Sequence, residues 1–288
     1  MTPTICIYHG NCADGFGAAW AIWKRFGDVA TRYHAGVYGK SPPDVTGEHV
    51  LLVDFSYKRP VLEQMASVAA SITVLDHHKT AEADLRPMLD AGTIQGEFDM
   101  NRSGAMMAWQ WAWPDKPAPK LIQHIEDRDL WRFALPGTRA IQATLFSYPY
   151  DFAVWDELIA DAENAAELEG LVAEGMAIER KHFKDIAELV AVSARPMLIG
   201  GHKVMVANLP YTMSSDAAGQ LSEGQPFAAC YMDTPDGRVF SLRSRGDQAV
   251  DVSEIAQRFG GGGHKNAAGF TAPIGWEGEG PTPAATEQ

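Results

Sequence analysis

The fold is decided by residues 72–79, which read I-T-V-L-D-H-H-K. The first four residues suit a buried parallel strand, and Asp76, His77 and His78 follow one another at its carboxyl end. In an open α/β sheet, ligands bind at this end, where the loops leave a crevice between the helices. Alone, each polar residue would be typical of a turn or of the surface, but three together favour a metal or phosphate site. Successive side chains of an extended segment point to opposite faces, so a site using all three requires the chain to turn here.

Two earlier strands are predicted to end in the same way. Residues 4–8, T-I-C-I-Y, form an apolar strand, and the run H-V-L-L-V-D-F-S places Asp54 directly after another. A helix over residues 60–70 then leads into the next strand, as in a right-handed crossover of a parallel sheet. We therefore expect Asp14, Asp54 and Asp76 to converge. The first strand is followed by four polar residues that could bind a metal: His9, Asn11, Cys12 and Asp14.

The later part of the chain predicts a change of domain. Residues 150–192 are rich in Ala, Glu and Leu and indicate one long helical tract, interrupted lightly near Gly170 and Gly175. Beyond Pro196 the pattern changes to strands. The predicted organisation is α/β, with a parallel-sheet domain over residues 1–148, a helical linker over 149–194, a smaller α/β domain over 195–275 and a disordered tail over 276–288.

A glycine-rich segment near the end of the chain predicts a second functional element. Residues 260–270 read G-G-G-G-H-K-N-A-A-G-F, and Arg243 lies on a preceding strand. Successive backbone N–H groups beside an arginine and a histidine suit the binding of a phosphate or a nucleotide end. We therefore expect a backbone nest at this place.

The amino-acid composition and net charge limit which binding partners and which cellular compartment are expected. The chain has 288 residues, of which 46% are hydrophobic and 21% charged, and its formal net charge is −13. Such a surface repels polyanions, so a wide duplex-DNA footprint is not expected and a phosphate substrate must be captured locally. The three cysteines show no paired spacing, which indicates a reducing compartment. Without a run of about eighteen apolar residues, a cytoplasmic protein with no membrane partner is expected.

Together, Asp54, the Asp76-His77-His78 triplet and the motif G-G-G-H-x-x-A-A-G resemble the DHH phosphoesterase superfamily over nearly the whole chain. Similar proteins include RecJ-like single-strand exonucleases, nano-RNases and exopolyphosphatase-related proteins. The resemblance implies a catalytic DHH domain, a helical linker and a DHHA1-type domain that grips substrate across a cleft. It also implies Mn²⁺, with two ions expected and Mg²⁺ as the alternative.

The resemblance also implies roles for individual residues. The implied metal ligands are His9, Asp14, Asp54, His77 and Asp127, with Asp129 as the alternative to Asp127. The implied catalytic residues are Asp54, Asp76, His77 and His78. The implied substrate-binding residues are His78, Arg243, Gly261, Gly262, Gly263 and His264. In the first motif, Cys12 replaces an aspartate of the family pattern, and we favour His9 over Cys12 as the ligand because hard Mn²⁺ does not prefer sulfur.

The expected activity is the Mn²⁺-dependent hydrolysis of terminal phosphodiester bonds in single-stranded or short oligonucleotides. The alternatives are an exopolyphosphatase and a non-catalytic nucleotide-binding module. A base-stacking aromatic beside the pocket would favour nucleic acid, and the residues considered for it are Phe270, Tyr231 and Phe240. A homodimer is the assembly considered.

Overall fold

The structure is a computed structural model that describes residues 2–10, 12–246 and 249–279. The chain divides into two compact units, Met1–Glu179 and Arg180–Gln288, and the division falls within helix α8 (Ala165–Ser193). The first unit contains a parallel sheet and the second a mixed sheet, each with helices. The predicted α/β class, with a parallel-sheet unit before a smaller α/β unit, is confirmed.

The first unit is built on a five-stranded parallel sheet in the order β2-β1-β3-β4-β5. Its strands are β1 (Ile5–His9), β2 (Arg32–Gly36), β3 (His49–Val53), β4 (Ser71–Asp76) and β5 (Gln95–Phe98). In the central strands Tyr8 pairs with Val53, and Val53 pairs with Leu75. The carboxyl ends of β1, β3 and β4 therefore lie next to one another, as the sequence predicts.

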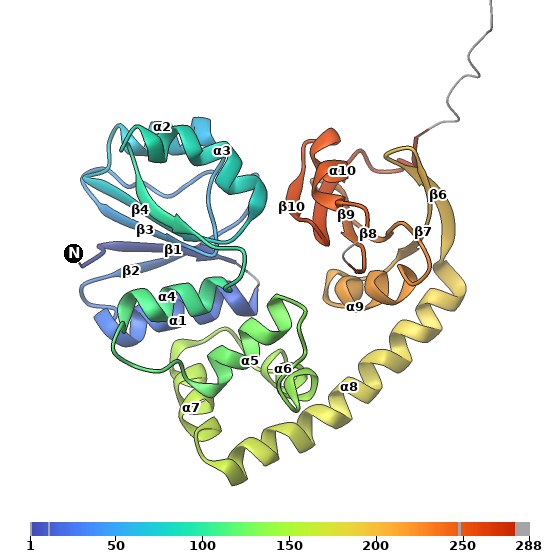
Figure 1. The fold of residues 1–288 in the computed structure, drawn as a ribbon, viewed down its shortest axis with the longest axis horizontal. Coiled ribbons are helices and arrows are strands. Elements are labelled where there is room, and N and C mark those ends of the chain that lie inside the picture. The colour runs from blue at the N-terminus through green and yellow to red at the C-terminus, as the bar shows by residue number, and fades with distance from the viewer. Residues whose placement is uncertain (1, 11, 247–248, 280–288) are drawn as a thin grey trace, which may run out of the picture. The chain divides into compact units, whose positions relative to one another are not determined.

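Helices cover both faces of this sheet (Figure 1). The helices α2 (Arg59–Ala66) and α3 (Lys79–Asp90) lie on one face, and α1 (Ala13–Phe26) and α4 (Gly104–Ala112) lie on the other. Alternate strand residues supply the two cores, since Ile5 and Ile7 pack on the side of α2 and α3 while Cys6 packs on the side of α1. This two-sided burial explains the almost continuous apolar runs of the strands.

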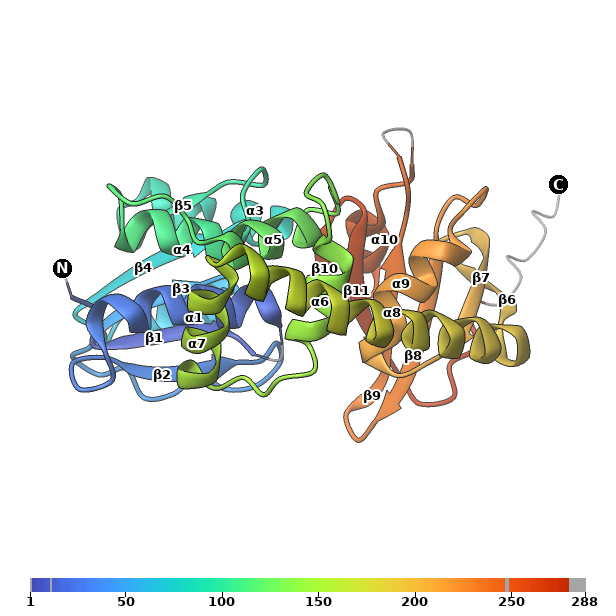
Figure 2. The ribbon, with the colours of Figure 1, turned by 90° about the horizontal axis from the view of Figure 1, so that it is seen from below.

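Further helices pack beyond α1 and α4: α5 (Lys120–Asp129), α6 (Thr138–Leu145) and α7 (Phe152–Ala162), seen together with the first part of α8 in Figure 2. The fully buried Trp155 of α7 meets Phe16 of α1, with 4.9 Å between ring centroids. The sequence predicted one helical tract broken near two glycines. Instead α7 ends at Ala162 and α8 begins at Ala165, and α8 continues through both glycines.

The second unit has a six-stranded sheet in the order β10-β11-β9-β8-β7-β6, in which β7 and β8 pair in parallel and the other neighbours are antiparallel. Its strands are β6 (Arg195–Ile199), β7 (His202–Asn208), β8 (Ala228–Thr234), β9 (Gly237–Arg243), β10 (Gly262–His264) and β11 (Ala267–Ala272). The helices are α9 (Tyr211–Leu221) and α10 (Val252–Arg258). Phe240 and Leu242 face the core that contains α10, whereas Cys230 faces α9.

The end of the described chain differs from its prediction. Residues 276–279 were assigned to a disordered tail, but Trp276 packs against the core of the second unit. Arg238 also donates hydrogen bonds to the Trp276 carbonyl and to Glu277. The predicted tail is rich in glycine, proline and glutamate, and this composition does not indicate that Trp276 anchors it. The rest of the predicted tail lies outside the described residues.

Among the helices that the structure describes, none combines the length and the apolar character that a membrane span requires.

Candidate metal centre

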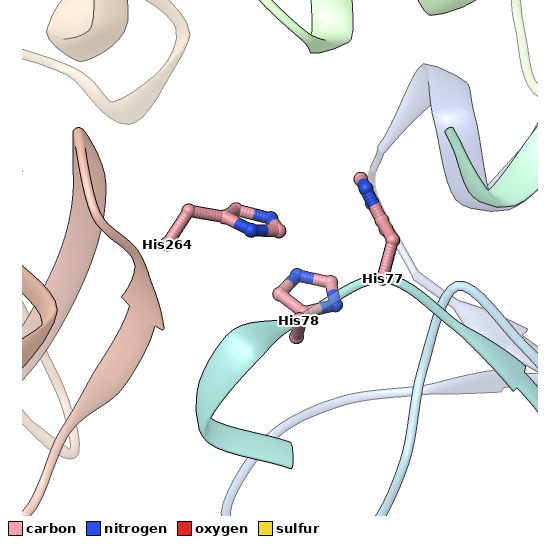
Figure 3. A group of neighbouring side chains, drawn as sticks. All are labelled: His77, His78 and His264. Carbon is pink, nitrogen blue, oxygen red and sulfur yellow. The ribbon is translucent and has the colours of Figure 1, made fainter. Parts of the chain in front are cut away.

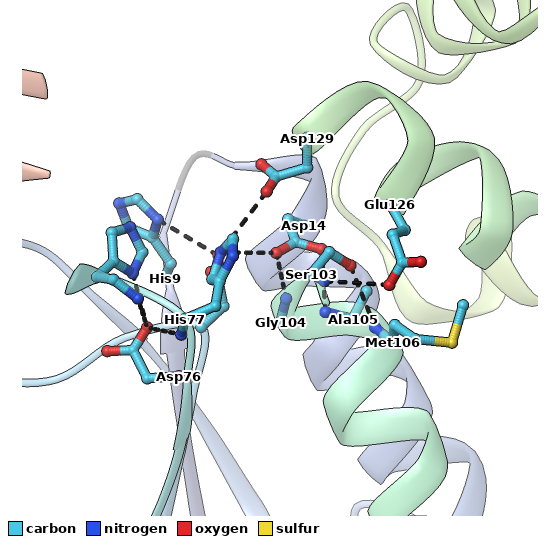
Figure 4. A network of polar contacts seen from close by, with 12 residues as sticks. His9, Asp14, Asp76, His77, Ser103, Gly104, Ala105, Met106, Glu126 and Asp129 are labelled. Carbon is cyan, nitrogen blue, oxygen red and sulfur yellow. Dashed lines mark hydrogen bonds and ion pairs between the residues drawn. The ribbon is translucent and has the colours of Figure 1, made fainter. Parts of the chain in front are cut away.

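His77 lies among three carboxylates, of which those of Asp14 and Asp54 are buried (Figure 4). Its Nε2 atom is 3.0 Å from Oδ1 of Asp54, 3.5 Å from Oδ2 of Asp14 and 3.6 Å from Oδ2 of Asp129. The side chains of the histidine, Asp14 and Asp54 are each 2% exposed. Three separate parts of the chain therefore bring carboxylate oxygens to one imidazole nitrogen.

The backbone fixes Asp54 in an unusual position. Asp54 directly follows β3 and has φ of 53°, a left-handed conformation that is strained for a residue other than glycine. Its N–H donates to the Leu75 carbonyl on the neighbouring strand at 2.9 Å. A Cβ atom placed on Gly104 would lie 2.3 Å from Cβ of Asp54, so only glycine fits at the start of α4. Strain of this kind is held by the surrounding structure and is typical of functional sites.

Asp14 is held by the first turn of α4. It lies in the first turn of α1, and its carboxylate accepts hydrogen bonds from the N–H groups of Gly104, at 2.6 Å, and Ala105, at 3.0 Å. Ser103 caps the same helix, because its hydroxyl accepts from the Met106 N–H. The helix N-terminus thereby both orients a carboxylate and favours its negative charge.

The crowding of charges shifts the pKa values of these groups. Burial raises the pKa of Asp14 well above its ordinary value, and repulsion by Asp54 and Asp129 raises it further. Burial also raises the pKa of Asp129. Burial opposes ionisation of Asp54 too, but the hydrogen bond with His77 and the approach of His9 hold its pKa below the ordinary value. Several carboxylates held close together and shielded from water are stabilised by a cation bound among them.

The other oxygen of Asp54 faces a different histidine. Its Oδ2 atom lies 3.5 Å from Nδ1 of His9 and has no hydrogen-bond partner among the residues that the structure describes. Cys12 belongs to the same group, because ligand atoms of His9, Cys12 and Asp54 all lie within 4.8 Å of one another. Asp54 therefore stands between two sets of ligand atoms. The neighbouring Asn11, one of the four polar residues that follow the first strand, lies outside the described residues.

The chain turns at the end of β4, as a site using the whole triplet requires. β4 ends at Asp76, and α3 begins at Lys79 after His78 (Figure 3). The buried Asp76 accepts hydrogen bonds from the His77 N–H at 2.8 Å and from the Ser56 hydroxyl at 3.0 Å. Its Oδ1 atom is also 2.6 Å from Nδ1 of His78. Asp76 thus organises the turn and orients the second imidazole.

The expectation that Asp127 would join the metal ligands is corrected by its surroundings. Its carboxylate accepts hydrogen bonds from the N–H groups of Ala134 and Leu135, at 2.8 and 3.0 Å, and from the hydroxyl of Thr138, at 2.5 Å. It therefore holds the loop after α5. Asp129, two residues later, is the acid beside His77.

The predicted substrate-binding residues of the second unit lie on one hairpin and its neighbouring strand. Gly262, Gly263 and His264 belong to β10, which pairs with β11, so the segment is a hairpin and not the expected nest (Figure 3 shows His264 on its strand). Gly261 comes directly before this strand, and a Cβ there would lie 2.0 Å from the Gly269 carbonyl oxygen.

Strand register puts two of the predicted substrate-binding residues, His264 and Arg243, on one face. His264 pairs with Ala267, and Ala267 pairs with Arg243. Directly opposed residues of an antiparallel ladder project to the same face, so a small alanine separates the histidine from the arginine. Arg243 also donates to the Ser215 hydroxyl of α9 at 2.6 Å.

The three aromatics considered for base stacking do not have the exposure that stacking needs. Phe240, Phe270 and Tyr231 are 0%, 4% and 7% exposed and belong to the core of the second unit. Gly104 was missed as a residue of the site, although it is the first residue of α4, directly after the capping residue Ser103. Nothing in the sequence alone indicates that this residue touches Asp54.

The donor groups fit hard divalent cations. Carboxylate oxygens with some imidazole suit Mn²⁺ or Mg²⁺. Asp14, His77 and Asp129 place ligand atoms within 4.8 Å of one another, as do Asp54, Asp76 and His78. The buried Oδ2 atom of Asp54, without a hydrogen-bond partner among the described residues, is the kind of atom that a cation satisfies.

Comparisons with known proteins first add two likenesses in sequence. Residues 201–278 match the family described as the DHHA1 domain. The chain is 32% identical over 292 residues to the uncharacterized protein R106 of Acanthamoeba polyphaga mimivirus. That match covers 92% of this chain and 66% of R106, so the chain spans just under two thirds of its relative's length.

Two solved structures are similar to this chain at low identity, and the first of them shares the fold. The DHH domain of PF0399, a protein described as a member of a ribosomal protein family, has a TM-score of 0.56 at 12% identity, covering 93% of this chain and 82% of that one. RecJ from Thermus thermophilus, solved in complex with Mn²⁺, has a TM-score of 0.48 at 17% identity, covering 94% of this chain and 49% of RecJ.

Proposed function

We propose that this chain is a member of the DHH phosphoesterase superfamily, to whose DHHA1 domain residues 201–278 are similar, and that it is a manganese-dependent phosphodiesterase that removes nucleotides from the ends of single-stranded or short oligonucleotides. Members of this superfamily are metal-dependent phosphoesterases. The observation that carries the proposal is the position of Asp54, whose two carboxylate oxygens face His77 and His9. A carboxylate placed in this way suits a bridge between two divalent cations.

The reaction explains why such a site needs these residue types. A phosphodiester is anionic and repels hydroxide, and two bound divalent cations offset its charge and lower the pKa of a bound water. The chain supplies ligand oxygens that are already in place. Asp14 is fixed by the N–H groups at the start of α4, and Asp54 by its strained backbone. Such pre-organisation avoids rearrangement during the reaction.

His78 is the residue that we assign to the substrate phosphate. Its Nδ1 atom meets Oδ1 of Asp76 at 2.6 Å, which favours a proton on Nδ1 and fixes the ring orientation. The carboxylate of Asp76 is itself held by the Ser56 hydroxyl. Nε2 is then the ring atom that would contact a phosphate oxygen.

The second unit supplies the features that we assign to phosphate capture. Arg243 and His264 project from one face of the sheet with Ala267 between them. An arginine fork and an imidazole on one face suit the oxygens of a terminal phosphate. The formal net charge of −13 supports a short substrate end over a long polyanion.

Inorganic polyphosphate is the alternative substrate. It presents the same terminal phosphate chemistry without a base. The aromatics considered for stacking are buried, so they do not favour nucleic acid over polyphosphate.

The proposal is tested with three substrates side by side. A five-nucleotide DNA, the matching RNA and polyphosphate, each labelled at one end, are incubated with Mn²⁺ and separately with a chelator. We expect mononucleotides from an oligonucleotide with Mn²⁺ and no product with the chelator. Release of phosphate from polyphosphate alone would instead identify an exopolyphosphatase.

Matched variants connect the product to the site. Asp54→Ala should lower the rate by at least about 100-fold, because even residues that only support metal ligands cost about 10- to 100-fold in affinity or activity. Asp161→Asn, at an exposed acid of α7, should leave the rate unchanged. If no phosphate substrate gives a metal-dependent product, the proposal fails and a non-catalytic nucleotide-binding module is left.

A further inference from the structure

The ligand group around Cys12 differs in chemistry from the rest of the centre. Cys12 is the residue before α1, with extended φ and ψ of −133° and 136°, and its side chain is half-buried. Its ligand atom lies within 4.8 Å of those of His9 and Asp54. Cys6 and Cys230, the other two cysteines, are buried in apolar cores.

A second observation points to a ligand at this group. The side chain of Asp54 is 2% exposed, and its Oδ2 atom has no hydrogen-bond partner among the described residues. The same atom faces His9 at 3.5 Å. A buried carboxylate oxygen without a hydrogen bond is costly, and a cation held by the imidazole, the thiolate and this oxygen would remove that cost.

The two sides of Asp54 offer donors of different softness. On one side are His77 and the carboxylates of Asp14 and Asp129. On the other are one imidazole and one sulfur. Thiolate ligands favour zinc and other thiophilic cations, whereas carboxylates favour manganese and magnesium.

We propose that the Cys12 thiolate is a metal ligand and that the His9–Cys12–Asp54 group binds a thiophilic divalent cation such as Zn²⁺, while the carboxylate-rich group binds Mn²⁺. The thiol proton leaves to solvent as the metal–sulfur bond forms. This inference rests on the two-cation centre of the proposed function and makes that centre a mixed-metal one.

Cobalt tests the sulfur ligand without any substrate. Co²⁺ bound by a thiolate has a near-ultraviolet charge-transfer band, which a centre of nitrogen and oxygen ligands lacks. Titration of the full chain with Co²⁺ should produce this band, saturating at one equivalent. Cys12→Ser and Cys12→Asp should lose the band. Cys230→Ala, which removes a buried thiol of the second unit, should keep it.

Metal content supplies a second readout. After addition of one equivalent of Zn²⁺, then of excess Mn²⁺, and removal of unbound metal, the parent should retain one zinc and one manganese per chain. Cys12→Asp should lower zinc affinity at this group by at least about 10-fold, since supporting residues alone cost about 10- to 100-fold. Aspartate is also a favoured residue before a helix, so this variant should fold.

The outcomes separate this inference from the proposed activity. Cobalt binding without the band, or a band that survives in Cys12→Ser, would overturn the inference even if the oligonucleotide assay succeeds. The band without hydrolysis of any substrate would support the sulfur ligand and refute the activity. A parent chain that binds no cobalt at all would overturn both.

Discussion

Gly104 and Asp54 touch so closely that a methyl group on the glycine would lie 2.3 Å from Cβ of the aspartate. The contact joins the first residue of α4 to the loop after β3. It leaves Asp54 in a left-handed conformation with its two oxygens turned toward His77 and His9. The geometry of the centre thus depends on a residue that offers no ligand atom from a side chain.

Replacing this glycine should damage the centre more than the fold. Gly104→Ala is expected to displace Asp54, destabilise the protein by about 1–3 kcal/mol through overpacking and weaken Mn²⁺ binding. Gly170→Ala is the matched control, because a Cβ at Gly170 of α8 meets nothing within 4 Å. That change should stabilise by about 0.5–1 kcal/mol. Thermal unfolding and manganese titration measure both, and unchanged manganese binding in Gly104→Ala would contradict the packing argument.

The stability of the chelated protein should fall as pH rises. Burial acts to lower the pKa of His77, but the hydrogen bond with Asp54 and the nearby carboxylates outweigh it and raise that pKa above its ordinary 6.5. Burial raises the pKa of Asp14. These two groups therefore bind more protons in the folded protein than in the unfolded chain, and their contributions to stability are lost as pH rises through the folded pKa values. The melting temperature of the first unit in chelator should decrease from about pH 6 to about pH 8.

Manganese should reverse this trend, because both protons must leave before His77 and Asp14 bind a cation. Calorimetry at the two pH values, with and without Mn²⁺, gives the comparison. His77→Gln should flatten the slope seen in chelator. A melting temperature that rises with pH in the chelated parent would count against the assigned shifts.

Asp127 and Asp129 should respond in opposite ways to the same substitution. Asp127→Asn removes charge-assisted hydrogen bonds to Ala134, Leu135 and Thr138, and should cost about 1–3 kcal/mol with manganese affinity retained. Asp129→Asn should weaken manganese binding at least about 10-fold. Because it also relieves the repulsion that raises the pKa of Asp14, its melting temperature in chelator should not fall. The reverse pattern would restore Asp127 as the ligand.

Trp276 should contribute to the stability of the second unit. Its ring packs at 5.2 to 5.8 Å from those of Phe240, Phe259 and Phe270. Trp276→Ala is expected to cost on the order of 2 kcal/mol. Ile274→Ala, at a side chain that is 62% exposed, serves as the control and should have little effect. Equal denaturation midpoints for the two variants would show that the packing adds nothing.

The sequence located most of the centre because parallel strands end at one edge of a sheet. Asp54 and His77 follow buried strands, so their meeting needed only the strand order. The choice between Asp127 and Asp129 needed more, because residues two apart on a helix point about 200° from each other. Which of the two faces the sheet depends on how α5 packs against α1 and α4, a tertiary relation that local pattern does not contain.

The same limit explains the other differences. A glycine-rich segment such as residues 260–263 can form either a nest or a strand of a hairpin. It forms a hairpin here because β10 pairs with β11. Trp276 is surrounded in sequence by glycines and charged residues. Its contact with Phe240 is a tertiary contact, and the local sequence does not predict it. The left-handed backbone of Asp54 has no local signal, because the space that Gly104 leaves for it comes from a segment far along the chain.

Each of the two donor groups beside Asp54 contains one side chain that is partly exposed to solvent. Asp129 is 27% exposed on one side of Asp54, and His9 is 26% exposed on the other, while the carboxylate between them is sealed from water. Two bound cations would then exchange with solvent by separate routes, one past Asp129 and one past His9. Their exchange with the medium would be unequal in speed, so a chelator would strip the centre in two kinetic phases.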